Sequence, residues 1–338
     1  MIELLPEKGK FYKVNTHYHT VVSDGRETAR KIKELYKEKG YSAVCFTDHE
    51  VLAGHEELCD DEFVALHGYE IAIKKSLDHH TGWFMPVYHF NAIAKKQDNL
   101  IMTRFFRNNP SGSGNTLQSI ATLAEFSDEI ERTHYDDDWI NDFLKALTEK
   151  GFLITYCHPE WSLQTREDYI NLDHLHAVEL INSDSLSDNS AFHYAQLLRV
   201  GKRVVPTGGD DFHYMSNRAF GGWTMIKAEA LTYDALMEAY ERGDCYASEG
   251  PEILSLVLDG GKIKVKTSSA AQICLLSEGR YVDYVRAAGE LLTYAEFNYY
   301  PEKMGSFFRI EVRDSEGYKA FSNAYYTEDI DKKSWKKP

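Results

Sequence analysis

Short apolar runs alternate with amphipathic stretches along roughly the first three quarters of this chain. The runs typical of buried strands are 11–14, 43–47, 63–73, 85–94, 152–158, 176–182 and 202–210. The stretches with helical spacing are 27–40, a segment that begins near 116, 136–151 and 191–201. Because strands that alternate with helices form βα units, the pattern predicts an α/β fold, a parallel sheet or barrel with functional residues at the carboxyl ends of its strands.

Two of these helices have clear sequence signals. In the stretch 27–40, Ile32, Leu35 and Tyr36 recur on one face, and a glycine follows the last turn. The stretch 136–151 begins with three aspartates, and negative charge stabilises a helix N-terminus. Both are predicted to pack on the sheet through their apolar face.

A polar segment interrupts the alternation from about 97 to 136. It contains the sequence NNPSGSGN at 108–115, which is typical of a loop. We interpret this segment as an insertion between barrel elements, and loops of that length often form lids over active sites.

The pattern changes again near Ser248. Two alternating runs meet at Gly260 and Gly261, and the stretch 306–323 has the same form around SEG, so both predict β-hairpins. Strands without intervening helices predict a small all-β sandwich at 251–338, after a barrel at 1–250.

Composition narrows the function classes. The 338 residues are 43% hydrophobic, which suffices for a packed core, and carry a net charge of −15. Because nucleic-acid binding depends on Lys and Arg that neutralise phosphates, this charge disfavours a nucleic-acid partner and favours a small substrate. No apolar run of about 18 residues and no signal peptide are visible, so we expect a cytoplasmic protein without a membrane span. Five scattered cysteines without a Cys-x-x-Cys motif predict free thiols in a reducing compartment.

His17 and His19 are the first candidates for a metal site. Residues two apart in a strand point to the same side, so the two imidazoles form a pair of nitrogen donors. Further His and carboxylate side chains stand at or just past predicted strand ends, and with this pair the candidate ligands are His17, His19, Asp24, His49, Glu70, His89, His158, Asp211 and His213. These nine nitrogen and oxygen donors exceed what one ion needs, which predicts two or three divalent ions, zinc, manganese or iron.

The remaining histidines lack that placement. We expect surface or packing roles for His55, His67, His79, His80, His134, His174, His176 and His193.

The motifs HYH at 17–19, SDG at 23–25, FTDHE at 46–50, GYE at 68–70, CHPE at 157–160 and GGDDFH at 208–213 resemble, in order and spacing, those of the PHP (polymerase and histidinol phosphatase) superfamily. This resemblance implies a distorted (β/α)7 barrel with a trinuclear metal centre and phosphoesterase activity. Residues 221–251 and the β region that follows are similar to the CehA/McbA-like subgroup, some members of which hydrolyse carbamates or other non-phosphate esters.

The resemblance also implies how the ligands are shared. One ion would bind His17, His19, Glu70 and Asp211, and a second would bind Glu70, His89 and His158. A third would bind Asp24, His49 and His213. Asp210 and Phe212 are more charged or larger than the small residues common in the last motif.

The expected reaction is hydrolysis of a small phosphate ester by a hydroxide that bridges the metals, since a bound dication lowers the pKa of water to about 7. Arg218 is the candidate for holding the ester, and Asp48 for orienting a ligand or taking a proton. His213 is a catalytic candidate as well as a metal ligand. Asp210, Glu160 and Asn182 are weaker candidates. Two alternatives remain: a carbamate or carboxylic-ester hydrolase, and a non-enzymatic binding protein stabilised by metals.

Overall fold

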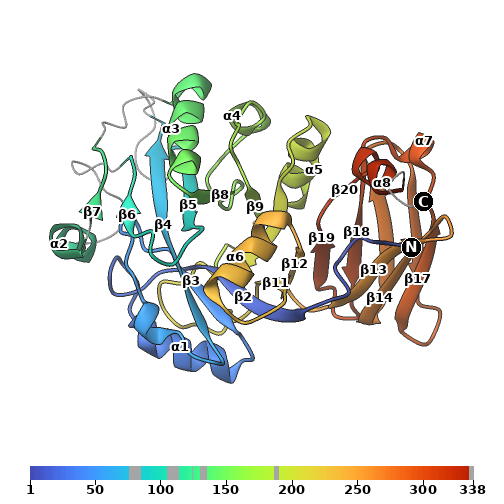
Figure 1. Ribbon diagram of the computed structural model, residues 1–338, viewed down its shortest axis with the longest axis horizontal. Coiled ribbons are helices and arrows are strands. Elements are labelled where there is room, and N and C mark those ends of the chain that lie inside the picture. Colours follow the sequence, from blue (N-terminus) through green and yellow to red (C-terminus); the bar gives the residue numbers. More distant parts are fainter. Residues whose placement is uncertain (76–84, 105–113, 124, 130–134, 186–189, 335–338) are drawn as a thin grey trace.

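The computed structural model describes residues 1–75, 85–104, 114–123, 125–129, 135–185 and 190–334. A mixed α/β region, with most of its helices around a curved sheet, continues into a β-rich region that also holds β1 (Ile2–Glu3) (Figure 1). Within the described residues, no helix combines the length and the apolar character needed to cross a membrane.

One 14-stranded sheet forms the framework. Its strands, in spatial order, are β10 (Val205–Gly209), β9 (Ala177–Asn182), β8 (Phe152–Tyr156), β5 (Val87–Ala94), β4 (Val64–Lys74), β3 (Ala43–Phe46), β2 (Lys10–Tyr18), β11 (Trp223–Ala228), β12 (Cys245–Ser248), β19 (Lys319–Ser322), β18 (Phe307–Arg313), β15 (Gln272–Ser277) and β16 (Val282–Arg286), with β20 (Tyr325–Tyr326) on β18. All seven strands predicted before residue 250 are present.

The direction of one strand differs from the prediction. β2, β3 and β4 are mutually parallel, as are β8, β9 and β10, but β5 is antiparallel to both β4 and β8. Antiparallel neighbours need no crossover helix between them. The expectation of parallel βα units throughout is therefore wrong at β5.

The predicted distorted (β/α)7 barrel is not confirmed, because within the described residues no strand ladder closes the sheet between β10 and β2. The segments that follow these strands do meet: the Asp211 N–H donates to the His17 carbonyl at 2.9 Å, and the His19 N–H donates to the Phe212 carbonyl at 3.2 Å. The seven strands from β2 to β10 thus form a curled, mixed sheet that brings its first and last strand ends together.

Helices lie along this sheet and at its ends. They are α1 (Ala29–Glu38), α2 (Gly114–Leu123), α3 (Asp137–Glu149), α4 (Arg166–Tyr169), α5 (Ala191–Arg199), α6 (Tyr233–Arg242), α7 (Pro301–Met304) and α8 (Thr327–Ser334), with a 3₁₀ turn at Glu56–Leu58. α1 begins where the Thr28 hydroxyl accepts from the Lys31 N–H, and α3 where the Asp136 carboxylate accepts from the Trp139 N–H. The predicted helices correspond to α1, α2, α3 and α5, whereas α4, α6, α7 and α8 were not predicted. The predicted loop at 108–115 falls mostly outside the described residues.

Apolar side chains of α6 pack against those of the curled sheet. Leu236 and Met237 from α6 share a buried cluster with Val14, Leu66 and Leu153 from the strands. Burial of such side chains contributes about 1.5–3 kcal/mol each, so this core fixes the strands whose far ends carry the candidate ligands. In the predicted insertion, the described residues include a two-stranded parallel sheet of β6 (Ile101–Met102) and β7 (Glu125–Phe126).

The β-rich region is built on the predicted hairpins. β13 (Ile253–Asp259) and β14 (Lys262–Ala270) pair across Gly260 and Gly261, whose φ values of 58° and 74° suit a tight turn. A second sheet of β1, β13, β14 and β17 (Leu292–Asn298) packs on the strands β15 and β18. β1 comes from the chain start, and the large sheet crosses from β12 into β19, so the two regions share one sheet. The division at residue 250 stays a prediction.

Candidate metal centre

Four buried side chains from three distant parts of the chain converge at one end of the curled sheet. The Nε2 atoms of His17 and His19 lie 3.3 Å apart, and each lies within 3.2 Å of Asp211 Oδ1. The Glu70 carboxylate completes the group at 3.5 Å from His17 and 3.3 Å from His19. One ligand atom from each residue lies within 4.8 Å of the others, which is the spacing that a single ion could bridge.

Glu70 belongs to a second group as well. Its Oε1 atom lies 2.7 Å from His89 Nδ1 and 3.2 Å from His158 Nε2. All three side chains are buried. A carboxylate that faces two sets of imidazoles can bridge two ions, so Glu70 is the common member of what we call the two inner groups.

Two of these ligands do not stand where the sequence suggested. Glu70 lies within the long strand β4 rather than at its end, and His89 lies near the beginning of β5. Because β5 is antiparallel, its beginning lies at the same edge as the carboxyl ends of its neighbours. His89 therefore reaches the centre for a different reason from the predicted one.

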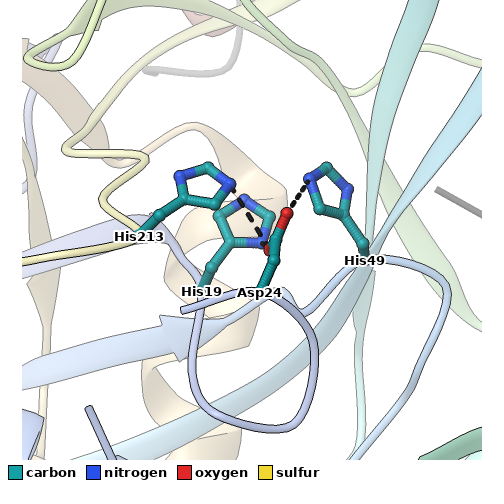
Figure 2. Close-up of side chains that lie close together, drawn as sticks. All are labelled: His19, Asp24, His49 and His213. Carbon is teal, nitrogen blue, oxygen red and sulfur yellow. Dashed lines mark ion pairs between the residues drawn. The ribbon is translucent and has the colours of Figure 1, made fainter. Parts of the chain in front are cut away.

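A third group lies nearer to solvent and is drawn in Figure 2, where Asp24 stands between His49 and His213 with His19 close by. Asp24 is 3.5 Å from His213 Nε2, 3.7 Å from His49 Nε2 and 3.8 Å from His19 Nδ1. The side chains of Asp24 and His213 are 24% and 28% exposed. We call these four residues the outer group; it shares His19 with the inner group of His17, Glu70 and Asp211.

The backbone at the centre departs from ordinary strand ends. His158 has φ of 25° and Asp211 has φ of 54°, both unusual for residues other than glycine. Such conformations cost about 1–3 kcal/mol each and persist where the surroundings enforce them. His158 stands two residues past the end of β8, and Asp211 two residues past the end of β10.

Further buried groups fix the orientation of the imidazoles. Glu179 Oε1 lies 3.1 Å from His17 Nδ1, which leaves the Nε2 atom of His17 facing the inner groups. The Ser162 hydroxyl lies 3.1 Å from His158 Nδ1 in the same manner. Partners of this kind set the tautomer and raise the basicity of metal-binding histidines.

Glu179 is the main residue that the sequence prediction of the site omitted. It accepts from the His158 N–H at 3.2 Å and from Asn182 Nδ2 at 3.0 Å. Asn182 also donates to Asp211 Oδ2 at 3.0 Å. A charged residue in the middle of the apolar run HAVELIN was the available signal for Glu179.

The site strongly favours positive charge. Burial alone raises the pKa of the Glu70 carboxyl, but the surrounding imidazoles hold that pKa well below its usual range. Burial opposes protonation of His19, yet hydrogen bonds to Asp211 and Glu70 raise its pKa to about 10. In the same way, the carboxylates outweigh burial at His158 and raise its pKa to about 9. Buried carboxylates with this effect would equally stabilise bound cations.

The donor set fits divalent ions better than a purely protein hydrogen-bond network. The His17 and His19 Nε2 atoms lie 3.3 Å apart, and both lie within 3.2 Å of the same Asp211 oxygen, so three donor atoms face one point where a cation could bind. Glu70 Oε2 and His49 Nδ1 are buried and 2.9 Å apart but are not aligned as a hydrogen bond. Nitrogen and carboxylate donors without thiolate suit zinc, manganese or iron.

Cys157 lies behind the inner groups near His17 and Glu179. Burial raises the pKa of its thiol, so the group is held neutral. Its group with His17 and Glu179 shares only His17 with the inner groups.

Asp48 is engaged in the loop that carries Asp24. Its carboxylate accepts from the backbone and hydroxyl of both Thr20 and Ser23, at 2.7–3.1 Å. These four bonds fix the 20–24 turn, so the geometry supports a positioning role for Asp48.

Three weaker or catalytic candidates have other contacts or are exposed: Asp210, Glu160 and Arg218. Asp210 accepts from Tyr36 and from the backbone N–H groups of 220–222, so it anchors that loop. Glu160 is exposed. In the described part of the chain, the Arg218 guanidinium hydrogen-bonds to Asp184, at 2.6 Å to its carboxylate.

Several of the other histidines pack or hydrogen-bond elsewhere. His67 accepts from the His55 N–H, and His176 Nε2 lies 3.1 Å from the Tyr240 carbonyl. Burial lowers the pKa of both His67 and His176 to about 4, as expected for neutral core histidines. His79, His80 and His134 lie outside the described residues.

No family model and no curated protein matches this chain. Solved structures do. A two-domain protein from Bacteroides vulgatus containing a predicted PHP-like metal-dependent phosphoesterase is 11% identical over 96% of this chain and 98% of its own, with a TM-score of 0.44. A protein from Bifidobacterium adolescentis, named as a candidate metal-dependent phosphoesterase, is 17% identical over 62% of this chain and 89% of its own, with a TM-score of 0.39. An amidohydrolase from Chromobacterium violaceum with bound sulfate and no metal is 14% identical over 61% of this chain and 89% of its own, with a TM-score of 0.37. Among solved structures this chain is thus similar, at low identity, to proteins described as PHP-like metal-dependent phosphoesterases.

Proposed function

We propose that this chain is a metal-dependent hydrolase, and that its reaction is the cleavage of a small phosphate ester of the nucleotide or sugar-phosphate type. The observation that carries the proposal is the convergence of the two inner groups and the outer group on the shared residues Glu70 and His19. A purely structural site needs one closed set of ligands, whereas adjacent sets with shared ligands are typical of metal-assisted hydrolysis.

We assign His17, His19, Glu70 and Asp211 to one ion, and Glu70, His89 and His158 to a second. Asp24, His49 and His213 would hold a third. Divalent ions bound there would lower the pKa of a water molecule and neutralise charge on the ester oxygens. The chain contributes two or three such sites in this proposal, for zinc, manganese or iron.

The residues of the chain have separate roles around these ions. Glu179 and Ser162 hold the imidazoles of His17 and His158 in the orientation that points Nε2 at the centre. Asn182 orients Asp211. His213 is part of the exposed side of the centre, where a proton can exchange with solvent, and burial followed by the nearby His19 lowers its pKa to about 4. Asp48 keeps Asp24 in place through the 20–24 turn.

Arg218 remains the proposed cation for holding the ester. Its guanidinium is compensated by Asp184, whose own pKa is raised by burial and by the charge of Asp211. Asn182 accepts from the Asp184 N–H at 3.1 Å and donates to Asp211 at 3.0 Å, so the pair of Asp184 and Arg218 lies close to the centre. Rotation away from Asp184 would free the guanidinium for a phosphate.

The first test is elemental analysis of protein purified without chelator. We expect at least two transition-metal equivalents per chain, since the inner groups are buried and preorganised. Fewer than one equivalent, without activity restored by manganese or zinc, would contradict the proposal.

The second test is a substrate screen with nucleoside monophosphates, sugar phosphates, aryl phosphodiesters and aryl carbamates. The proposal expects turnover of a phosphate ester by the wild type and none by Glu70→Gln, with Glu34→Gln as the matched control, because Glu34 is exposed on α1. Turnover of carbamates alone would move the chain to the reaction type of the CehA/McbA-like subgroup. Binding without any turnover would favour a non-enzymatic role.

A further inference from the structure

A polar cavity lies next to Asn182, which contacts the metal centre, and its chemistry differs from that of the centre. It encloses about 670 Å³ between the 217–223 segment, the end of β9 and the β-rich region. Four basic side chains line it, Lys13, Lys39, Arg218 and Lys319, against the single carboxylate of Glu249. In a chain with a net charge of −15, this gathering of cations is unusual.

Two of the four basic groups already have partners. Arg218 pairs with Asp184 at 2.6 Å, and the Lys319 ammonium lies 4.0 Å from Glu311. Lys13 and Lys39 differ from them, because within the described residues neither ammonium has a hydrogen bond or an ion pair. Lys13 and Lys39 are therefore the two basic groups free to bind an anion.

Aromatic rings hold both free ammonium groups. Lys13 Nζ lies 3.7 Å from the ring centroid of Trp223 and 4.1 Å from that of Tyr41, and Lys39 Nζ lies 5.5 Å from that of Phe220. Phe220 and Trp223 line the cavity, and the buried Tyr41 ring lies behind them, with its centroid 6.3 Å from Phe220 and 6.4 Å from Trp223. The face of an aromatic ring attracts an ammonium group but does not engage all three of its N–H donors. The remaining N–H groups can donate to a ligand.

The environment of Lys13 supports this arrangement. Burial is the largest influence on its ammonium and lowers its pKa to about 8, although the charges of Asp210 and Glu252 act in the opposite direction. A half-buried ammonium without an ion pair is costly, and an anion in the cavity would relieve that cost.

We propose that this cavity binds a small aromatic compound that carries a doubly charged phosphoryl group, with the group held by Lys13 and Lys39 and the ring packed against Trp223 and Phe220. The two ammonium groups would neutralise the two negative charges of the phosphoryl group, and the rings of Trp223 and Phe220 would pack against a planar ring. The site is separate from the metal ligands, and Asn182 links the two, since it lines the cavity and donates to Asp211. The proposal does not depend on the hydrolytic activity.

The experiment uses phenylphosphonate, which has the ring and the dianion but no ester bond to hydrolyse. Its binding to the full chain is measured by calorimetry in an Asp211→Asn background, where binding of the phosphonate by metals is weakened. We expect the background protein to bind phenylphosphonate. Lys13→Met and Lys39→Met should each weaken this binding about tenfold or more, which is the effect of losing one charge-assisted hydrogen bond. The double variant should abolish it. Methionine keeps the length of the side chain against the rings.

Lys31→Met is the matched control, because Lys31 is an exposed lysine on the neighbouring helix α1. It should bind phenylphosphonate as the background protein does. Equal binding by the double variant, or no binding at millimolar concentration, would overturn the proposal. Lys39 is exposed at the end of α1, so its variant tests the site even if Lys13→Met does not fold.

Discussion

The inner and outer ligand groups of the candidate metal centre differ in how firmly the fold holds them. The inner ligands come from β2, β4, β5 and the residues that follow β8 and β10, and their donor atoms approach one another at 2.7–3.5 Å. The outer group depends on Asp24, which stands on a loop, and its closest approaches to the imidazoles are 3.5–3.8 Å. Strands position side chains more precisely than loops do.

This difference has a thermodynamic meaning. A buried, preassembled set of donors needs little reorganisation when an ion enters, whereas a half-exposed set must contract and displace water. We therefore expect the inner ions to be retained through purification and the outer ion to exchange with chelators. Partial occupancy of the outer site would then result from the position of Asp24 on a loop, while the strands that hold the inner groups stay unchanged.

Glu70→Gln should have the largest effect, because it removes the charge shared by both inner groups. We expect loss of the inner ions and a fall in hydrolysis of roughly 10³-fold or more, since metal stabilisation of charge in the transition state supplies several kcal/mol. Elemental analysis and initial rates measure this, with Glu34→Gln as the control. An unchanged metal content in a folded Glu70→Gln protein would refute the assignment of a bridging ligand.

Glu179→Gln should have the next largest effect and tests what holds the inner group in place. The amide keeps the shape but loses the charge that orients His17, so metal affinity should fall about 10- to 100-fold. Competition with a chromophoric chelator gives the affinity. Ser162→Ala removes a neutral partner of His158, so it should lower the metal affinity less than Glu179→Gln does. A larger loss of affinity for Ser162→Ala than for Glu179→Gln would contradict this expectation.

The sequence indicated which side chains converge because each of them follows or interrupts a recognisable apolar run. His158 and Asp211 stand two residues past the ends of their strands, so a local pattern was enough. Glu179 was omitted since its partner His17 is 162 residues away and only the packed sheet brings them together. The direction of β5 was also missed, because an apolar run does not encode which way its strand points. β1 has only two residues, too few for a pattern.

Asp24→Asn should affect the outer group alone. The variant loses the only carboxylate of that group, so we expect one metal equivalent fewer while the inner ions remain. Affinity at the outer site should fall roughly tenfold, the effect of losing a charge-assisted contact of about 1.5 kcal/mol. Stepwise removal with a chelator, followed by elemental analysis, measures the difference. Loss of all ions together would show that the two regions do not bind independently.

Asp48→Asn should produce the smallest change and separates two roles for that residue. If Asp48 fixes the turn that carries Asp24, an amide in its place puts an N–H₂ group where the carboxylate accepted from Thr20 or Ser23. The free energy of unfolding should then fall by about 1–3 kcal/mol, and only the outer ion should bind more weakly. If Asp48 instead transferred a proton, the turnover rate would fall about 10²- to 10⁴-fold with metal content unchanged. Urea unfolding, metal content and rate, measured on the same variant, distinguish the two. The four hydrogen bonds that Asp48 accepts from Thr20 and Ser23 lead us to expect the first outcome, because they tie its carboxylate to the turn that carries Asp24.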